Sequence, residues 1–142
     1  MSSPEPTSFI IAEYGADARP WMKRFAVGTP SVVTVFQGED ENASEFAMRV
    51  RSTVEAFGKG GGQIARAVLV GGGDASASLL PARSLAVRAL VTSMSATGAG
   101  SLILDGQGRD RFAMMGLADV VAAQVAGTGV RVNATGARVA AA

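Results

Sequence analysis

Histidine and cysteine are both absent from the 142 residues of the sequence. Without histidine the chain has no Ser-His-Asp triad, no imidazole general base and no histidine-ligated metal. Without cysteine it has no thiol nucleophile, no disulfide, no zinc finger and no iron–sulfur cluster. Any chemistry must therefore come from carboxylates, arginines, two lysines, hydroxyl groups and backbone dipoles.

Charged residues are also scarce. They make up 18% of the chain, and the formal net charge is only +1, whereas about 25% charged residues is usual for globular proteins. The small net charge argues against a nucleic-acid-binding protein and against a polybasic membrane anchor. With 48% hydrophobic residues, the composition predicts extensive burial, either between layers of one fold or at an oligomer interface.

Targeting and membrane signals are lacking as well. The first residues, which begin Met1-Ser-Ser-Pro4, have neither a basic segment nor an apolar segment of the kind found in secretory signals. The longest stretch without charge lies between Arg88 and Asp105, and it is rich in serine and glycine, which is not typical of a membrane span. We therefore expect a cytoplasmic protein without a membrane partner.

The pattern of apolar runs predicts one α/β domain over residues 8–135, preceded by a disordered leader (1–7) and followed by a frayed tail (136–142). Strands are predicted over 9–14, 21–27, 31–36, 64–70, 101–104 and 130–133. Helices are predicted over 42–57, about 76–96 and about 110–126. The order is β-β-β-α-β-α-β-α-β. Three strand–helix–strand units predict a mostly parallel sheet with three helices. The segment 21–27 fits either a second, antiparallel strand or a short helix; the strand is favoured, so the first two strands are expected to form an N-terminal antiparallel hairpin.

Two of these helices are informative. The first begins at Asn42 with Glu45 three residues later, which is a variant of the capping box. The second helix carries apolar residues around most of its circumference. It is therefore expected either to lie at the centre of the fold or to be covered by a partner subunit.

Three aspartates each follow a predicted strand: Asp40, Asp74 and Asp105. Ligands of open parallel sheets bind beyond the carboxyl ends of the strands, so these side chains could converge there. Three carboxylates suit Mg²⁺, and Arg109 lies close enough in sequence to neutralise a bound phosphate. The alternative is that the aspartates are ordinary turn and helix-start residues, and this alternative is favoured.

A triglycine segment, Gly71–Gly73, precedes the second helix and invites comparison with phosphate-binding loops, with Gly72 and Gly73 supplying backbone amides. The specific phosphate-loop and dinucleotide patterns are both missing. A flexible connector between strand and helix is therefore the favoured interpretation.

Two short segments resemble a known family. Asp74-Ala-Ser76 follows a predicted strand and opens a helix, and a later segment reads Phe112-Ala-Met-Met-Gly-Leu117. Together they resemble the sulphate-transporter and anti-sigma-factor-antagonist (STAS) domain, although Ala75 interrupts the Asp-Ser motif. The resemblance implies a non-enzymatic switch that binds protein partners, with Ser76 as its phosphorylation site.

These observations favour a small, non-catalytic α/β module without a cofactor that binds a protein partner or itself, while an enzymatic role stays open under the first alternative. The first alternative is a site for a small ligand, a nucleotide or Mg²⁺ at the carboxyl ends of the strands. It would use Asp40, Asp74, Asp105, Arg109, Gly72, Gly73 and Ser76. The second alternative is the STAS-like phosphoserine switch.

Overall fold

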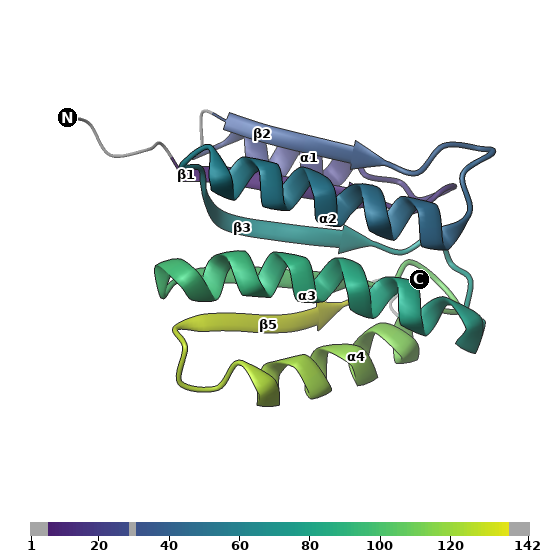
Figure 1. The fold of residues 1–142 in the computed structure, drawn as a ribbon. Coiled ribbons are helices and arrows are strands. Elements are labelled where there is room, and N and C mark those ends of the chain that lie inside the picture. The colour runs from purple at the N-terminus through teal and green to yellow at the C-terminus, as the bar shows by residue number, and fades with distance from the viewer. Residues whose placement is uncertain (1–5, 29–30, 137–142) are drawn as a thin grey trace.

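The computed structural model describes residues 6–28 and 31–136 and consists of one five-stranded sheet flanked by helices (Figure 1). All neighbouring strands are parallel, and their order is β2-β1-β3-β4-β5. This is one of the common orders of doubly wound α/β sheets. The strands are β1 (Pro6–Ala12), β2 (Ser31–Phe36), β3 (Gln63–Val70), β4 (Gly100–Asp105) and β5 (Val130–Thr135). The helices are α1 (Arg19–Ala26), α2 (Ala43–Lys59), α3 (Leu80–Thr97) and α4 (Arg111–Gln124), and a 3-10 turn, η1 (Ala77–Leu79), precedes α3.

The α/β class is confirmed, but the prediction of an N-terminal antiparallel hairpin is wrong. The segment expected as its second strand is helix α1, so the described chain has four helices, and β1 and β2 run parallel. Pro20 lies in the first turn of α1, where its missing N–H is not needed. Trp21 and Phe25 are four residues apart, so they share one face of the helix and bury it against the sheet. This spacing of two large aromatic residues outweighed the short strand-like pattern.

The two faces of the sheet are covered unequally. On the back face, the short helix α1 packs over Ile10 of β1 and Val68 of β3. Helices α2, α3 and α4 lie side by side on the front face and bury the main core with the sheet (Figure 1). Asn42 and Glu45 form both hydrogen bonds of the capping box at the start of α2, which confirms that helix start.

Helix α3 lies between α2 and α4 on the front face (Figure 1). Its buried residues include Val87, Leu90 and Met94, which contact the sheet and the neighbouring helix within the main core. The apolar circumference of this helix is therefore largely accounted for by its central position within one copy of the chain.

The ends of the domain need one correction. Strand β1 begins at Pro6, so the last two residues of the predicted leader belong to the sheet. The rest of the leader (1–5) and the tail from 137 onward lie outside the described residues. In the described part of the chain, no helix is both long and apolar enough to cross a membrane.

Candidate functional site

The strand order reverses between β1 and β3, and the chain leaves these two neighbours in opposite directions. After β1 it passes to α1 on the back face, and after β3 it passes to α3 on the front face (Figure 1). Loops that part in this way leave a crevice beyond the carboxyl ends of the strands, which is where doubly wound proteins bind ligands. We refer to the space between these two loops as the crevice.

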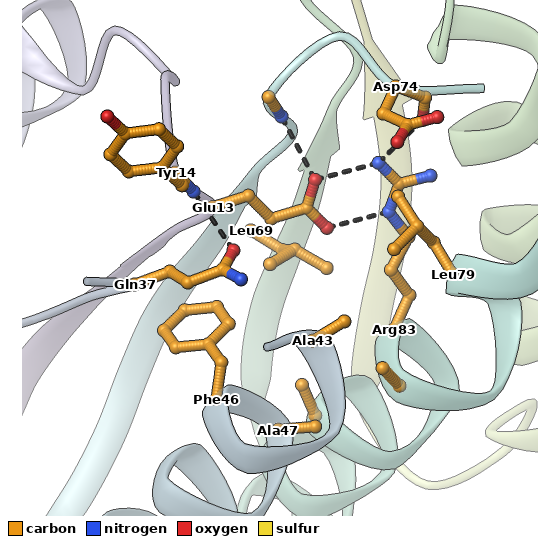
Figure 2. Close-up of a pocket in the computed structure, with 13 residues that line it drawn as sticks. Glu13, Tyr14, Gln37, Ala43, Phe46, Ala47, Leu69, Asp74, Leu79 and Arg83 are labelled. Atoms are coloured by element: carbon orange, nitrogen blue, oxygen red, sulfur yellow. Dashed lines mark hydrogen bonds and ion pairs between the residues drawn. The ribbon is translucent and has the colours of Figure 1, made fainter. Parts of the chain in front are cut away.

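A cavity of about 220 Å³ opens in this crevice. Figure 2 shows its polar side, where Glu13 follows β1 and points toward Arg83 of α3. Its apolar side is formed by Phe46, Leu69 and several alanines of α2 and α3 (Figure 2). Tyr14 and Gln37 lie at the β2 end of the cavity, where Gln37 Oε1 accepts a hydrogen bond from the backbone N–H of Tyr14 at 3.0 Å.

Glu13 and Arg83 form a bidentate ion pair at the centre of the site. Arg83 Nε donates to Glu13 Oε2 and Arg83 Nη2 donates to Glu13 Oε1, both at 2.7 Å. The arginine side chain is buried and that of the glutamate is nearly so. A bidentate pair of this geometry orients both side chains, and it links the end of β1 to the first turns of α3.

A second carboxylate, that of Asp110, completes the buried cluster. Asp110 Oδ2 lies 3.3 Å from Arg83 Nη2 and accepts a hydrogen bond from the backbone N–H of Gly73 at 3.0 Å. Asp110 Oδ1 accepts from the N–H of Gly108 at 3.2 Å. Asp110 directly precedes α4 and is fully buried, so the cluster joins the end of β1, the β3–α3 region and the start of α4, which are distant in the sequence.

The ion pairs with Glu13 and Asp110 affect the pKa of Arg83. Burial alone would lower the pKa of its guanidinium group. The hydrogen-bonded carboxylate of Glu13 and the negative charges of Asp110 and Asp74 outweigh burial and raise the pKa above its ordinary value. Arg83 therefore stays charged, and its carboxylate partners neutralise it within the protein.

The triglycine segment Gly71–Gly73 packs closely against this cluster and donates hydrogen bonds to its carboxylates. A Cβ atom at Gly71 would overlap Asp110 Oδ2, and one at Gly72 would lie 2.5 Å from the carbonyl oxygen of Tyr14. The N–H of Gly72 donates to Glu13 Oε1 at 3.0 Å, and that of Gly73 donates to Asp110. Protein carboxylates therefore occupy the two amides that could have held a phosphate.

Asp74 and Ser76 are the predicted side chains that the structure brings to the crevice region. Asp74 lines the cavity, is exposed, and accepts a hydrogen bond from the N–H of Ser76 at 2.8 Å. Its carbonyl oxygen accepts from Arg83 at 3.1 Å. Ser76 is also exposed, and its Oγ accepts a hydrogen bond from the N–H of Ser78 at the start of η1.

The other predicted side chains do not join them. Asp105 lies on the α1 side, where it is buried and accepts hydrogen bonds from Trp21 Nε1 at 2.7 Å and Gln107 Nε2 at 3.3 Å. Asp40 is exposed in the turn before α2, and Arg109 is exposed before α4. Within residues 6–28 and 31–136, no group of three or more carboxylates is placed to hold a metal ion.

Sequence reasoning missed the three charged residues that form the cluster. Glu13 follows a strand just as the three predicted aspartates do, but it fell inside the expected first strand. Arg83 begins the buried stripe that continues through Val87, Leu90 and Met94, and a lone charge on such a stripe is a signal for a buried ion pair. Asp110 gave only the weak signal of an acid at a helix start.

No protein-family model matches this chain, and a comparison with curated proteins found no match.

Proposed function

We propose that this chain is a binding domain for a small organic molecule with a positively charged group, such as an amine, and that the crevice is its site. One observation carries the proposal. A cavity at the point where the strand order reverses is bordered by more carboxylates than cations.

Position and size support a small ligand. The crevice is the expected binding place in a doubly wound sheet. The cavity of about 220 Å³ is smaller than the roughly 300–1,000 Å³ typical of drug-sized ligands. Its apolar side, with Phe46 and Leu69, suits a short hydrocarbon portion of the ligand.

Charge supports a cation rather than an anion. Glu13, Asp74 and Asp110 surround the single positive charge of Arg83. A phosphate or carboxylate ligand would have to displace the protein's own carboxylates from the amides of Gly72 and Gly73. An ammonium group instead finds the carboxylates of Asp74 and Glu13 in the lining of the cavity.

This proposal develops the small-ligand alternative that the sequence raised. Among the described residues, no arrangement of side chains supports the binding of a nucleotide or of Mg²⁺. The protein-interaction role and the STAS-like phosphoserine switch stay predictions. The exposure of Ser76 is compatible with modification, but no family match supports the resemblance.

The test is a ligand panel with matched charges. Melting temperature and calorimetric affinity are measured with butylamine, putrescine and agmatine, and with butanol and butyrate as neutral and anionic controls. A ligand that binds only the folded state raises the melting temperature. We expect a rise with at least one amine and none with butanol or butyrate. A panel in which no amine raises the melting temperature contradicts the proposal.

Two variants locate the site. Ala82→Leu places a larger side chain in the cavity lining and is expected to abolish amine binding. Asp74→Asn is expected to weaken it by about two- to fivefold, because one exposed charge contributes modestly. Asp40→Asn is the matched control, since Asp40 is exposed at the same edge of the sheet but does not line the cavity. Equal losses for Asp74→Asn and Asp40→Asn would place the site elsewhere.

A further inference from the structure

The outer face of α4 exposes several large apolar side chains, with the charged Asp119 among them. Phe112 is 72% exposed, Val120 is 55% exposed and Met115 is 42% exposed. Ala113, Gly116 and Ala123 are exposed on the same helix. Large apolar side chains exposed together on one helix are typical of an interaction site.

Gly116 lies in the middle of this face. A glycine inside a helix costs about 1 kcal/mol relative to alanine, so it usually has a packing reason. Here a Cβ atom would meet no atom within 4 Å, and nothing in the described fold requires the missing side chain.

Two opposite charges lie on one stripe of the same helix, at Arg111 and Asp119. Together with Met115 they border a groove between α4 and the edge strand β5. Neither charge forms an ion pair with any residue of the described ranges. Arg111 also begins the helix, where the helix dipole disfavours a positive charge.

The spacing of these charges makes the stripe self-complementary. Arg111 and Asp119 are separated by eight residues, which is about 12 Å along a helix, and Met115 lies midway between them. When two such helices are laid antiparallel about a two-fold axis at Met115, each Arg111 faces the Asp119 of the other copy. A two-fold axis requires this kind of reciprocal contact.

We propose that two copies of this chain associate through α4 in this antiparallel arrangement. Met115 lies at the two-fold axis, and Phe112, three residues before it, packs against the second copy beside the axis. Two reciprocal Arg111–Asp119 ion pairs set the register. The contact is one helix pair and its flanks, which is small beside the 1,200–2,000 Å² of a standard interface, so the dimer is expected to be weak and dependent on concentration.

Sedimentation velocity of the full chain between micromolar and millimolar concentration tests the proposal. The wild-type chain is expected to shift reversibly from monomer to dimer. A chain that stays monomeric throughout overturns the proposal, whether the face binds a different protein or nothing at all.

Charge reversal tests the register. Arg111→Glu and Asp119→Arg are each expected to weaken the dimer more than tenfold, because each brings like charges together. An equimolar mixture of the two variants restores both ion pairs in a heterodimer, so association is expected to return. Absence of heterodimer in the mixture overturns the arrangement, and monomeric forms of each variant with the wild-type melting temperature show that folding is intact.

A methionine pair provides the matched control. Met115→Lys on α4 is expected to abolish dimerisation. Met48→Lys makes the same change on the exposed face of α2, where the side chain has a similar exposure, and is expected to leave dimerisation unchanged. Loss of the dimer in both variants, or in neither, overturns the assignment to α4.

Discussion

Two arginine–carboxylate clusters in this molecule have the same parts and opposite surroundings. In the crevice, Arg83 holds Glu13 with two hydrogen bonds of 2.7 Å, and the N–H of Gly72 donates to the same carboxylate. Beside α2, Arg49 holds Glu41 with two hydrogen bonds of 2.8 Å, and the N–H of Gly38 donates to it. The Arg83 side chain is 4% exposed, whereas that of Arg49 is 45% exposed.

The difference in exposure determines how many hydrogen-bond partners each arginine requires from the protein. Water can solvate the open side of Arg49, whose hydrogen-bond partners in the protein are one carboxylate and the carbonyl of Phe36 and whose guanidinium lies over the ring of Phe46. Arg83 has little access to water and recruits the carbonyl of Asp74 and the carboxylate of Asp110 in addition. The same type of ion pair therefore joins neighbouring residues at the surface, in Arg49–Glu41, and joins segments distant in the sequence in the crevice, in Arg83–Glu13.

Replacing each arginine in turn is expected to give the largest difference in stability between the two clusters. Arg83→Met leaves Glu13 and Asp110 without their cation in a buried site, and we expect the free energy of unfolding to fall by about 3–5 kcal/mol. Arg49→Met removes a half-exposed partner and is expected to cost about 1 kcal/mol or less. Urea denaturation at pH 7 measures both. Similar losses for the two variants would show that burial does not distinguish the clusters.

The glycines provide the next comparison. A Cβ atom at Gly72 would lie 2.5 Å from the carbonyl oxygen of Tyr14, a backbone atom that cannot easily move. Gly72→Ala is therefore expected to lower the free energy of unfolding by about 1–3 kcal/mol. At Gly38 the nearest atom would be Glu41 Cβ at 3.9 Å, so Gly38→Ala is expected to change it by less than about 0.5 kcal/mol. A loss at Gly38 that equals the loss at Gly72 would contradict the crowding argument.

The contrast between contacts of near neighbours and contacts of distant segments also explains how much of the fold the sequence could predict. Features that depend on near neighbours were predictable, such as the capping box at Asn42 and the strand–helix–strand units. The exception is α1, whose eight residues fit a short strand as well as a helix, and only the four-residue spacing of Trp21 and Phe25 distinguishes the two. A strand at this position implies a hairpin, whereas a helix lets β1 and β2 run parallel.

The crevice was predictable only in position. The sequence predicts residues at the carboxyl ends of the strands, but parallel strands send side chains there from both faces of the sheet. Asp105 consequently faces α1, whereas Asp74 lies in the crevice. Glu13 and Arg83 are 70 residues apart, and no pattern in the sequence relates two residues at that distance before the strand order is known.

The pH dependence of the surface cluster gives the smallest predicted effect. The hydrogen-bonded Arg49 guanidinium lowers the pKa of Glu41 from its ordinary value to about 2. A carboxyl group whose pKa is lower in the folded state stabilises the fold above its unfolded pKa, near 4.5, and loses that contribution as the pH falls toward 2. The free energy of unfolding of the wild-type chain should therefore exceed that of Arg49→Met by up to about 1 kcal/mol at pH 6, and the excess should shrink steadily below pH 4.5.

A second arginine of the same helix separates this effect from the loss of a positive charge. Arg51 lies two residues further along α2 and contacts Glu55 at 3.5 Å without the bidentate geometry. Arg51→Met changes the net charge by the same amount as Arg49→Met. The free energy of unfolding of the two variants is therefore compared between pH 4.5 and 2, and the part of the pH dependence that differs between them belongs to the Glu41 cluster. Urea midpoints measured at half-unit pH steps resolve it. If both variants differ from the wild-type chain by the same amount at every pH, then Arg49 stabilises the fold through general charge rather than through its hydrogen bonds to Glu41.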